Sequence, residues 1–208
     1  MPKAEARSGT VAGIILAAGM STRLGHPKQL LEIDGMPLVA HVAERCLRSR
    51  MDRTIVVIGH EAAAVEAALS GLDVEIVTNP DYASGQASSL LAGLDAVGDE
   101  ADAVLFLLGD QPGIDPVAIG RLIDARRDGA IVGMARYGDQ RGHPVLFGRE
   151  LFDELRTIRG DQGGRDVIRR HAESLAVVDG GSPRVPADVD TWTDYDRLLE
   201  SWSEPNHE

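Results

Sequence analysis

Short apolar runs alternate with helical patterns along this chain, and this alternation restricts the fold more than any other feature. The runs predict buried strands, and the stretches between them have the length and periodicity of helices. The expected strands are Val11–Leu16, Thr54–Ile58, Val74–Thr78, Ala103–Leu108 and Ala130–Met134, and the expected helices lie near Pro37–Arg50, Glu61–Leu69, Ser88–Val97 and Pro116–Arg127. Repeated βαβ units of this kind predict an α/β fold with a parallel sheet covered on both faces.

The length and composition favour one domain in the cytoplasm. The 208 residues suffice for one α/β domain and hardly for two, so we expect a single domain over 11–202 with flexible tails at 1–10 and 203–208. No apolar run approaches the roughly 20 residues that cross a bilayer, and residues 1–10 lack a signal-peptide core. The net charge of −12 disfavours nucleic-acid and acidic-membrane partners. The single cysteine, Cys46, excludes an internal disulfide and predicts a buried helical residue.

The carboxyl ends of parallel strands share one edge of the sheet, and ligands of open α/β sheets bind there. This rule places four segments of the chain along one rim. They are the loop 16–28, Gly59-His60, Asn79-Pro80 and Gly109-Asp110. Candidate functional residues are therefore expected in these segments.

The loop after the first strand reads Leu-Ala-Ala-Gly-Met-Ser-Thr-Arg-Leu-Gly-His-Pro-Lys over residues 16–28. Its small residues let the backbone approach a ligand closely, so that main-chain N–H groups can cradle phosphate oxygens. Arg23 and Lys28 add positive charge, and Lys28 is one of only two lysines in the chain. The spacing fits neither a Walker loop nor the dinucleotide fingerprint. The alternative interpretation is an ordinary strand-to-helix turn rich in small residues.

Asp110 directly follows the fourth expected strand and therefore lies at the same rim. A carboxylate at this position can hold a divalent cation against the phosphates of a nucleoside triphosphate. The alternative is that Asp110 opens a turn before Pro112, which is common in Asp-x-Pro sequences.

A second acidic segment, Asp188-Val189-Asp190-Thr191, lies far downstream. Thr191 with Asp194 has the spacing of a helix N-cap and its acidic partner. Asp188 and Asp190 are two residues apart, so both point to one side if the segment is extended. Either carboxylate could complete a Mg²⁺ site with Asp110, and the choice between them stays open.

Two further segments are polar and glycine-rich. Amides, hydroxyls and a helix N-terminus in Asn79–Leu90 could bind a base and ribose, although Ser88 or Ser89 could simply cap the helix. Residues 139–147 and 159–165 are expected to form the side that binds a second substrate. A lone histidine such as His143 is more often structural than catalytic.

Taken together, these segments resemble the MobA-like NTP transferase family, and within it the molybdenum cofactor cytidylyltransferase (MocA-like) branch, over about residues 12–199. The loop matches the signature L-A-A-G-x-S-x-R-x-G-x-x-K, whose Leu-Ala-Ala-Gly form is similar to the cytidylyltransferase version. The resemblance implies a three-layer α/β/α Rossmann-like nucleotidyltransferase fold with a mostly parallel sheet. It also implies Mg²⁺-dependent transfer of CMP from CTP to the phosphate of molybdenum-molybdopterin, with release of pyrophosphate and with Mn²⁺ as an alternative ion.

The resemblance assigns roles to residues of this chain. The catalytic residues would be Arg23, Lys28 and Asp110, with the metal held by Asp110 and Asp190 or Asp188. The nucleotide-binding residues would be Leu16, Ala17, Ala18, Gly19, Ser21, Arg23, Lys28, Asn79, Gly85, Gln86, Ser88, Ser89 and Gly109. The acceptor-binding residues would be Gln111, Pro112, Arg141, Gly142, His143, Pro144, Gly160 and Gly163. Gln111 departs from the Met that related molybdopterin enzymes often carry, which puts the pterin acceptor in question.

Two other interpretations remain open at this stage. The first is a guanylyltransferase or another nucleotidyltransferase that acts on a different phosphorylated acceptor. The second is a non-catalytic nucleotide- or cofactor-binding chaperone that serves a molybdoenzyme. A complete metal site disfavours the second interpretation, because binding alone does not require one.

Overall fold

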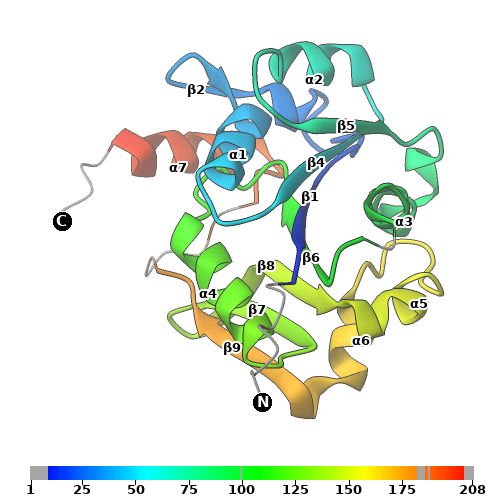
Figure 1. Ribbon diagram of the computed structural model, residues 1–208. Helices are drawn as coiled ribbons and strands as arrows, with labels where there is room; N and C mark the ends of the chain where they lie inside the picture. The colour runs from blue at the N-terminus through cyan, green and yellow to red at the C-terminus, as the bar shows by residue number, and fades with distance from the viewer. Residues whose placement is uncertain (1–8, 99, 182–185, 187, 204–208) are drawn as a thin grey trace, which may run out of the picture.

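The computed structural model describes residues 9–98, 100–181, 186 and 188–203 (Figure 1). Of the expected tails 1–10 and 203–208, residues 1–8 and 204–208 lie outside the described part. The Thr10 N–H donates a hydrogen bond to Asp102 Oδ2, and Ser203 ends the last helix, so these two residues belong to the fold. No helix in the described part is long and apolar enough to cross a membrane.

The core of the molecule is a seven-stranded sheet with the strand order β5-β4-β1-β6-β8-β7-β9. Its strands are β1 (Val11–Ala17), β4 (Arg53–Ile58), β5 (Glu75–Thr78), β6 (Ala103–Leu108), β7 (Val132–Tyr137), β8 (Gln140–Gly148) and β9 (Leu175–Asp179). β8 is antiparallel to both of its neighbours, whereas the other strand pairs of this sheet are parallel. The expectation of a mostly parallel sheet is therefore confirmed.

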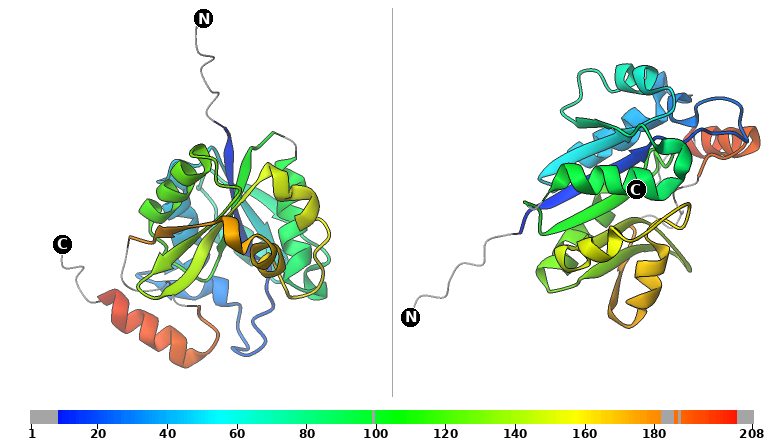
Figure 2. Two further views of the ribbon diagram at one scale, coloured as in Figure 1. Left: turned by 90° about the horizontal axis from the view of Figure 1, so that it is seen from below. Right: turned by 90° about the vertical axis from the view of Figure 1, so that its right-hand side faces the viewer.

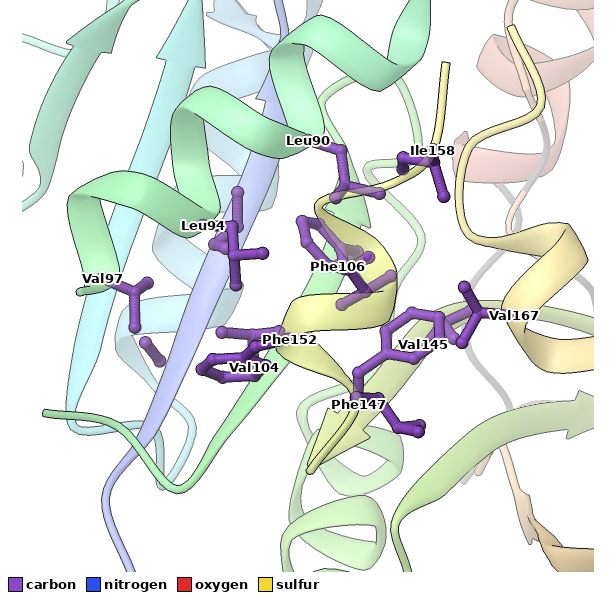
Figure 3. Close-up of a cluster of buried hydrophobic side chains, with 14 of the residues drawn as sticks. Leu90, Leu94, Val97, Val104, Phe106, Val145, Phe147, Phe152, Ile158 and Val167 are labelled. Carbon is purple, nitrogen blue, oxygen red and sulfur yellow. The ribbon is translucent and has the colours of Figure 1, made fainter. Parts of the chain in front are cut away.

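Helices cover both faces of this sheet and complete three layers (Figure 2). One face packs against α1 (Leu38–Leu47), α2 (Ala62–Ala68) and α4 (Pro116–Arg127), and the other against α3 (Gln86–Val97), α5 (Phe152–Leu155) and α6 (Arg165–Arg170). Neighbouring residues of a strand serve opposite faces, because strand side chains alternate. Ile14 belongs to the core under α3 and Ile15 to the core under α1. Figure 3 shows the first of these cores, in which Leu90 and Leu94 of α3 lie near Phe106 of β6.

The five expected strands and four expected helices all occur, with bounds that differ by a few residues. Cys46 is 1% exposed on α1, as expected, and burial raises the pKa of its thiol. The sequence interpretation missed β8, which occupies the segment 139–147 that was read only as a polar stretch. It also missed β9, α5 and α6.

A smaller assembly lies beside the main sheet, which we call the peripheral unit. It consists of the hairpin β2 (Glu32–Ile33) and β3 (Met36–Pro37) together with helix α7 (Trp192–Ser203), which lie side by side in Figures 1 and 2. A separate apolar cluster holds it together, formed by Leu24, Leu31, Ile33, Leu38, Val189 and Leu198. Tyr195 Oη donates a hydrogen bond to the Glu32 carbonyl, which ties α7 to the hairpin.

Candidate active site

The loop after β1 folds back on itself and brings Lys28 to the carboxyl edge of the sheet. Ser21 has a positive φ of 52°, and its carbonyl accepts hydrogen bonds from the N–H groups of Leu24 and Gly25, both at 3.1 Å. The Ser21 hydroxyl accepts a hydrogen bond from the Lys28 N–H at 3.1 Å. The Gln29 side chain donates to the Gly19 carbonyl at 3.1 Å. These contacts, between backbone groups and from the side chains of Ser21 and Gln29, fix the shape of the loop.

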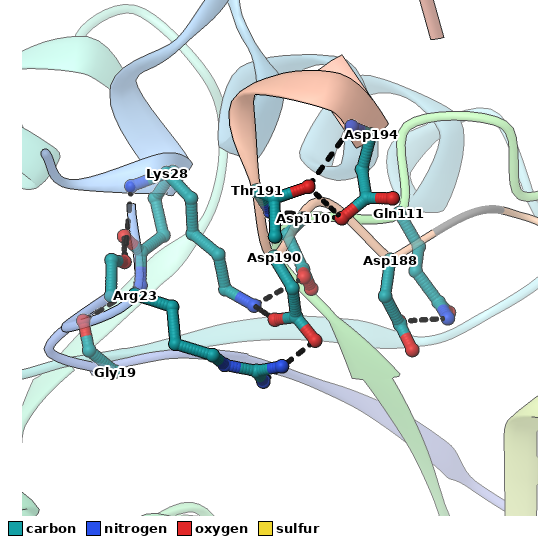
Figure 4. Close-up of polar contacts among 11 residues, drawn as sticks. Gly19, Arg23, Lys28, Asp110, Gln111, Asp188, Asp190, Thr191 and Asp194 are labelled. Atoms are coloured by element: carbon teal, nitrogen blue, oxygen red, sulfur yellow. Dashed lines mark hydrogen bonds and ion pairs between the residues drawn. The ribbon is translucent and has the colours of Figure 1, made fainter. Parts of the chain in front are cut away.

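Lys28 lies between two carboxylates that come from distant parts of the chain (Figure 4). Its Nζ is 2.6 Å from Asp110 Oδ2 and 3.1 Å from Asp190 Oδ1. Arg23 Nη2 donates to the other oxygen of Asp190 at 2.7 Å. Two cations from the loop and two carboxylates, one from the middle of the chain and one from near its C-terminal end, therefore form one network.

Burial sets the electrostatics of this network. Asp110 is 5% exposed, and burial raises its pKa although the Lys28 ammonium acts in the opposite direction. Burial alone would lower the pKa of Lys28, but the charges of Asp110 and Asp190 outweigh it and the pKa is raised. Lys28 is therefore a permanent cation, suited to hold an anionic ligand in a partly desolvated site.

The burial of Val189 orients Asp188 and Asp190, the residues on either side of it, towards the site. Its side chain is fully buried in the apolar cluster of the peripheral unit. Asp188 and Asp190 flank it and both line the cavity described next. The predicted common orientation of the two aspartates is thus confirmed, and the anchor is the residue between them. The predicted cap also occurs, because the Asp194 N–H donates to Thr191 Oγ1 and the Thr191 N–H donates to Asp194 Oδ2.

Asp188 and Asp190 have different partners. Asp190 binds the two cations, whereas Asp188 Oδ1 accepts a hydrogen bond from Gln111 Nε2 at 2.7 Å. Among the residues that the structure describes, no group of three or more His, Cys, Asp or Glu side chains is arranged to hold a metal ion. The carboxylates that share Lys28 are Asp110 and Asp190, and Asp188 stands apart from that pair.

A cavity of about 540 Å³ opens over this network and unites most of the predicted nucleotide residues. The predicted residues that line it are Leu16, Ala18, Gly19, Arg23, Lys28, Gly85, Gln86, Ser89, Asp110, Asp188 and Asp190. Met20 and Tyr82, which belong to the predicted segments 16–28 and 79–90 but were not singled out, also line it, as does Gln29, which was not predicted. Arg23 and Asp110 thus share one cavity, as the sequence interpretation required.

Four other predicted nucleotide residues, Gly109, Asn79, Ser88 and Ser21, do not line the cavity but contact the segments that do. Gly109 lies against β1, where a Cβ atom would be 3.0 Å from the Ala17 Cβ. Asn79 is buried, and its amide donates to the hydroxyls of Ser88 and Ser89 at 2.9 and 3.0 Å. The first contact holds the segment after β6 close to β1, and the hydrogen bonds of Asn79 join the end of β5 to the start of α3. Ser21 acts similarly through the loop contacts described above.

Two N–H groups at the N-terminus of α3 have hydrogen-bond partners within the chain, although Gly85, Gln86 and Ser89 line the cavity. The Gln86 N–H donates to Asp161 Oδ1 at 3.2 Å, and the Ala87 N–H donates to the Gly160 carbonyl at 2.9 Å. Gly85 has a φ of 112°, and a Cβ there would lie 2.6 Å from the Gly160 carbonyl carbon. Gly160 was predicted on the acceptor side, and its observed role is to cap α3.

A second cavity, of about 340 Å³, adjoins the first and shares Leu16, Gln86, Leu108 and Asp188 with it. It contains the predicted acceptor residues Gln111, Arg141, Gly142, His143 and Gly163. Pro112, Pro144 and Gly160 are not among its lining residues, and both prolines are buried. Phe147 and Arg165, which also line it, belong to the segments 139–147 and 159–165 that were expected on the side of the second substrate. Phe106 lines it too and was not predicted, because it read only as a core position of a strand.

The antiparallel direction of β8 explains why Arg141 to His143 lie here. A strand that runs against its neighbours brings its N-terminal end to their carboxyl edge. The pairing register with β7 shifts between Met134 and Ala135, which leaves His143 and Pro144 as extra residues on β8. The His143 carbonyl accepts a hydrogen bond from Tyr137 Oη at 2.8 Å. Burial lowers the pKa of His143 to about 4, so its ring is neutral at pH 7.

Comparison with known proteins identifies relatives over nearly the whole chain. The model of the MobA-like NTP transferase domain matches residues 13–175. Nicotine blue oxidoreductase of Paenarthrobacter nicotinovorans is 36% identical over 198 residues, which cover 91% of this chain and 96% of that protein.

Solved structures agree with this assignment. The crystal structure of Rv0371c from Mycobacterium tuberculosis has a TM-score of 0.82 at 35% identity and covers 93% of this chain and 100% of that one. The same protein has been solved in complex with manganese, with a TM-score of 0.76 at 36% identity over 92% of this chain and 99% of that one. A nucleotidyl transferase from Methanothermobacter has a TM-score of 0.80 at 27% identity, with 93% and 97% coverage.

Proposed function

Because the chain belongs to the MobA-like NTP transferase family, a family of nucleotidyltransferases, we propose that it transfers CMP from CTP to the phosphate of a molybdopterin-type acceptor. The observation that carries the proposal is the placement of Lys28 and Arg23 with Asp110 and Asp190 in one cavity. An adjoining cavity with rings on its wall supplies room for a second substrate. The choice of CTP rests on the Leu-Ala-Ala-Gly form of the loop.

The carboxylates fit a divalent cation. Asp110 is buried beside the cavity and Asp190 faces it, and oxygen donors of this kind suit Mg²⁺ or Mn²⁺. Two carboxylates without a third match the way Mg²⁺ is held with nucleotide phosphates, which supply further ligands. When bound, the ion would neutralise negative charge on the triphosphate. The manganese complex of the mycobacterial relative supports this assignment.

The residues of this chain would act by position and charge. A phosphate oxygen of the acceptor attacks the α-phosphorus of CTP, a new P–O bond forms, and the bond to the β-phosphate breaks with release of pyrophosphate. The substrate supplies the nucleophile, so no covalent enzyme intermediate is required. Lys28 and Arg23 would exchange their carboxylate partners for phosphate oxygens and stabilise the leaving pyrophosphate. We also propose one catalytic domain over 11–202 and action in the cytoplasm.

A second candidate function follows from the relative named as an oxidoreductase, which matches 91% of this chain. In this alternative the second cavity would hold a flat, reducible ring rather than a phosphorylated acceptor. The aromatic wall formed by Phe106 and Phe147 suits either ring system.

The decisive experiment incubates the protein with Mg²⁺ or Mn²⁺, molybdenum-bearing molybdopterin and each of CTP, GTP, ATP and UTP. We expect pyrophosphate release with CTP and a product whose mass equals the acceptor plus CMP. Product with GTP would replace the cytidylyl assignment by a guanylyl one. No nucleotide transfer, together with oxidation of NADH or NADPH by a ring acceptor, would overturn the proposal in favour of the second candidate.

A further inference from the structure

Gln111 and Asp188 form a hydrogen-bonded pair at the boundary between the two cavities. Asp188 lines both cavities, whereas Gln111 lines the second one. The two side chains come from the segment after β6 and from the segment before α7, and Figure 4 shows them facing each other beside the Lys28 network. Neither residue takes part in the ion pairs that Lys28 and Arg23 form with Asp110 and Asp190.

The carboxylate determines which way the Gln111 amide points. An ionised carboxylate can only accept hydrogen bonds, so the amide nitrogen, at 2.7 Å, must be the atom that faces Asp188. The amide oxygen Oε1 is therefore directed away from Asp188. Gln111 is 6% exposed, and Oε1 is buried with no hydrogen-bond partner among the described residues. A buried acceptor without a donor is costly, which indicates that a ligand supplies the donor.

The walls of the second cavity indicate the chemistry of that ligand. Phe106 and Phe147 lie with ring centroids 5.9 Å apart and present an aromatic surface. Arg141 and Arg165 line the same cavity and can bind an anionic group. His143 Nδ1 is a second buried atom without a partner in this wall. A flat ring that carries both an N–H donor and an anionic substituent matches all of these features.

We propose that Gln111 selects acceptors whose flat ring donates an N–H to its Oε1, and that Asp188 is the positioning residue that orients the Gln111 amide. This inference rests on the proposed function, because it describes the acceptor of that reaction. It assigns Asp188 to acceptor recognition and leaves the metal to Asp110 and Asp190.

The test uses two flat, bicyclic carboxylates that differ in ring N–H groups, pterin-6-carboxylate and 2-naphthoate. Their Kd values are measured on the full chain by fluorescence or calorimetry, so that no turnover is needed. We expect the wild-type protein to prefer the pterin, and Gln111→Met to reduce this preference by roughly 10- to 100-fold. Gln111→Met keeps the side-chain length, and an unchanged Tm confirms that the variant folds.

Variants of Asp188 test the positioning role separately. Asp188→Ala frees the Gln111 amide to rotate and should lower the preference for the pterin, whereas Asp188→Asn keeps an acceptor for Gln111 Nε2 and should restore it. Mn²⁺ affinity, measured by electron paramagnetic resonance, should fall in Asp190→Asn and stay unchanged in Asp188→Ala. Loss of Mn²⁺ binding in Asp188→Ala with an unchanged preference would overturn the assignment.

Two further outcomes would also overturn the inference. One is equal binding of both probes by the wild-type protein, and the other is a preference that Gln111→Met leaves intact. The binding test and the transfer assay can fail separately, so the two proposals are tested apart. Transfer of CMP without any effect of Gln111 on the preference refutes the inference alone. The expected preferences without transfer from any nucleotide refute the proposed function alone.

Discussion

The two carboxylates that meet on Lys28 belong to regions of very different construction. Asp110 follows β6, which pairs with β1 and β8 and is covered on both faces, and the side chain of Asp110 is 6% exposed. Asp190 precedes α7 in the peripheral unit, and its side chain is 34% exposed. One wall of the site is therefore part of the central sheet, and the other is held by a small satellite cluster.

This difference indicates how the site can accept a large anionic ligand. Interactions in a close-packed core have little freedom to rearrange, whereas a small cluster at the edge can open locally at lower free energy. Asp110 and the central sheet should therefore keep their geometry when a triphosphate binds. The peripheral unit should move so that Arg23 and Lys28 leave Asp190 and bind the phosphates. The predictions below test this division.

The largest effect is expected at the residue that joins the two regions. Lys28→Met should lower kcat/KM by roughly 10²–10³-fold, because it removes the charge that stabilises the leaving pyrophosphate. Pyrophosphate release measures the loss. Arg48→Met, an exposed arginine on the far end of α1, is the control and should leave the rate unchanged. Near-normal turnover of Lys28→Met would refute the role of Lys28.

Removal of the charge of Asp110 should lower activity more than removal of the charge of Asp190. Asp110→Asn should reduce kcat/KM by about 100-fold and Asp190→Asn by about 10-fold, because water can replace a half-exposed ligand more readily than a buried one. Titration of activity with Mn²⁺ should show a larger rise in the required metal concentration for Asp110→Asn. Equal losses, or a larger loss at Asp190, would show that the peripheral unit is as rigid as the sheet.

Two fully buried valines provide a matched pair for the packing of the two regions. Val104 lies in the core under α3, and Val189 lies in the peripheral cluster. Val104→Ala should lower the free energy of unfolding by roughly 1–3 kcal/mol and leave the KM for CTP unchanged. Val189→Ala should lower the global Tm less but raise this KM several-fold, because it loosens the anchor of Asp190. Indistinguishable effects on KM would contradict the division.

We expect low pH to lower the folding stability of the domain that contains the main sheet, through protonation of His143. Its pKa of about 4 lies below the ordinary 6.5, since burial outweighs the opposite effect of Asp188 and Arg165 adds to it. Between these two pKa values the unfolded chain binds a proton that the folded chain does not. The contribution of His143 to the free energy of unfolding is therefore fully present above pH 6.5 and falls by roughly 1–3 kcal/mol as the pH is lowered to 4. Denaturant unfolding of His143→Gln should show a flatter pH dependence than wild type. An identical slope would exclude this contribution.

The smallest effect is expected at the cap of α7. Thr191→Ala removes a side-chain acceptor for the Asp194 N–H and should cost about 1 kcal/mol, confined to the peripheral unit. Amide hydrogen exchange should accelerate in α7 and stay unchanged in β6. Faster exchange throughout the sheet would show that the two regions unfold together.

Most of the sheet body could be predicted from the sequence, because its signals are local. The apolar runs of β1 and β6 and the helical pattern of α4 lie within a few residues of their observed bounds. β8 escaped prediction because its polar N-terminal half, over residues 140–143, belongs to a cavity wall and breaks the expected alternation. The cap at Thr191 was predictable, since N-cap signals depend on neighbours three residues apart.

By itself, the sequence determined the α/β class, the charged loop at the end of β1 and the carboxylates at 110, 188 and 190, because residue types and short spacings specify them. Only the tertiary structure decided that Lys28 lies between Asp110 and Asp190 and that Asp188 holds Gln111. These pairings join residues about 80 to 160 positions apart in the chain, and nothing in the local pattern sets them. They follow from the parallel pairing of β1 with β6 and from the burial of Val189, which are properties of long-range packing.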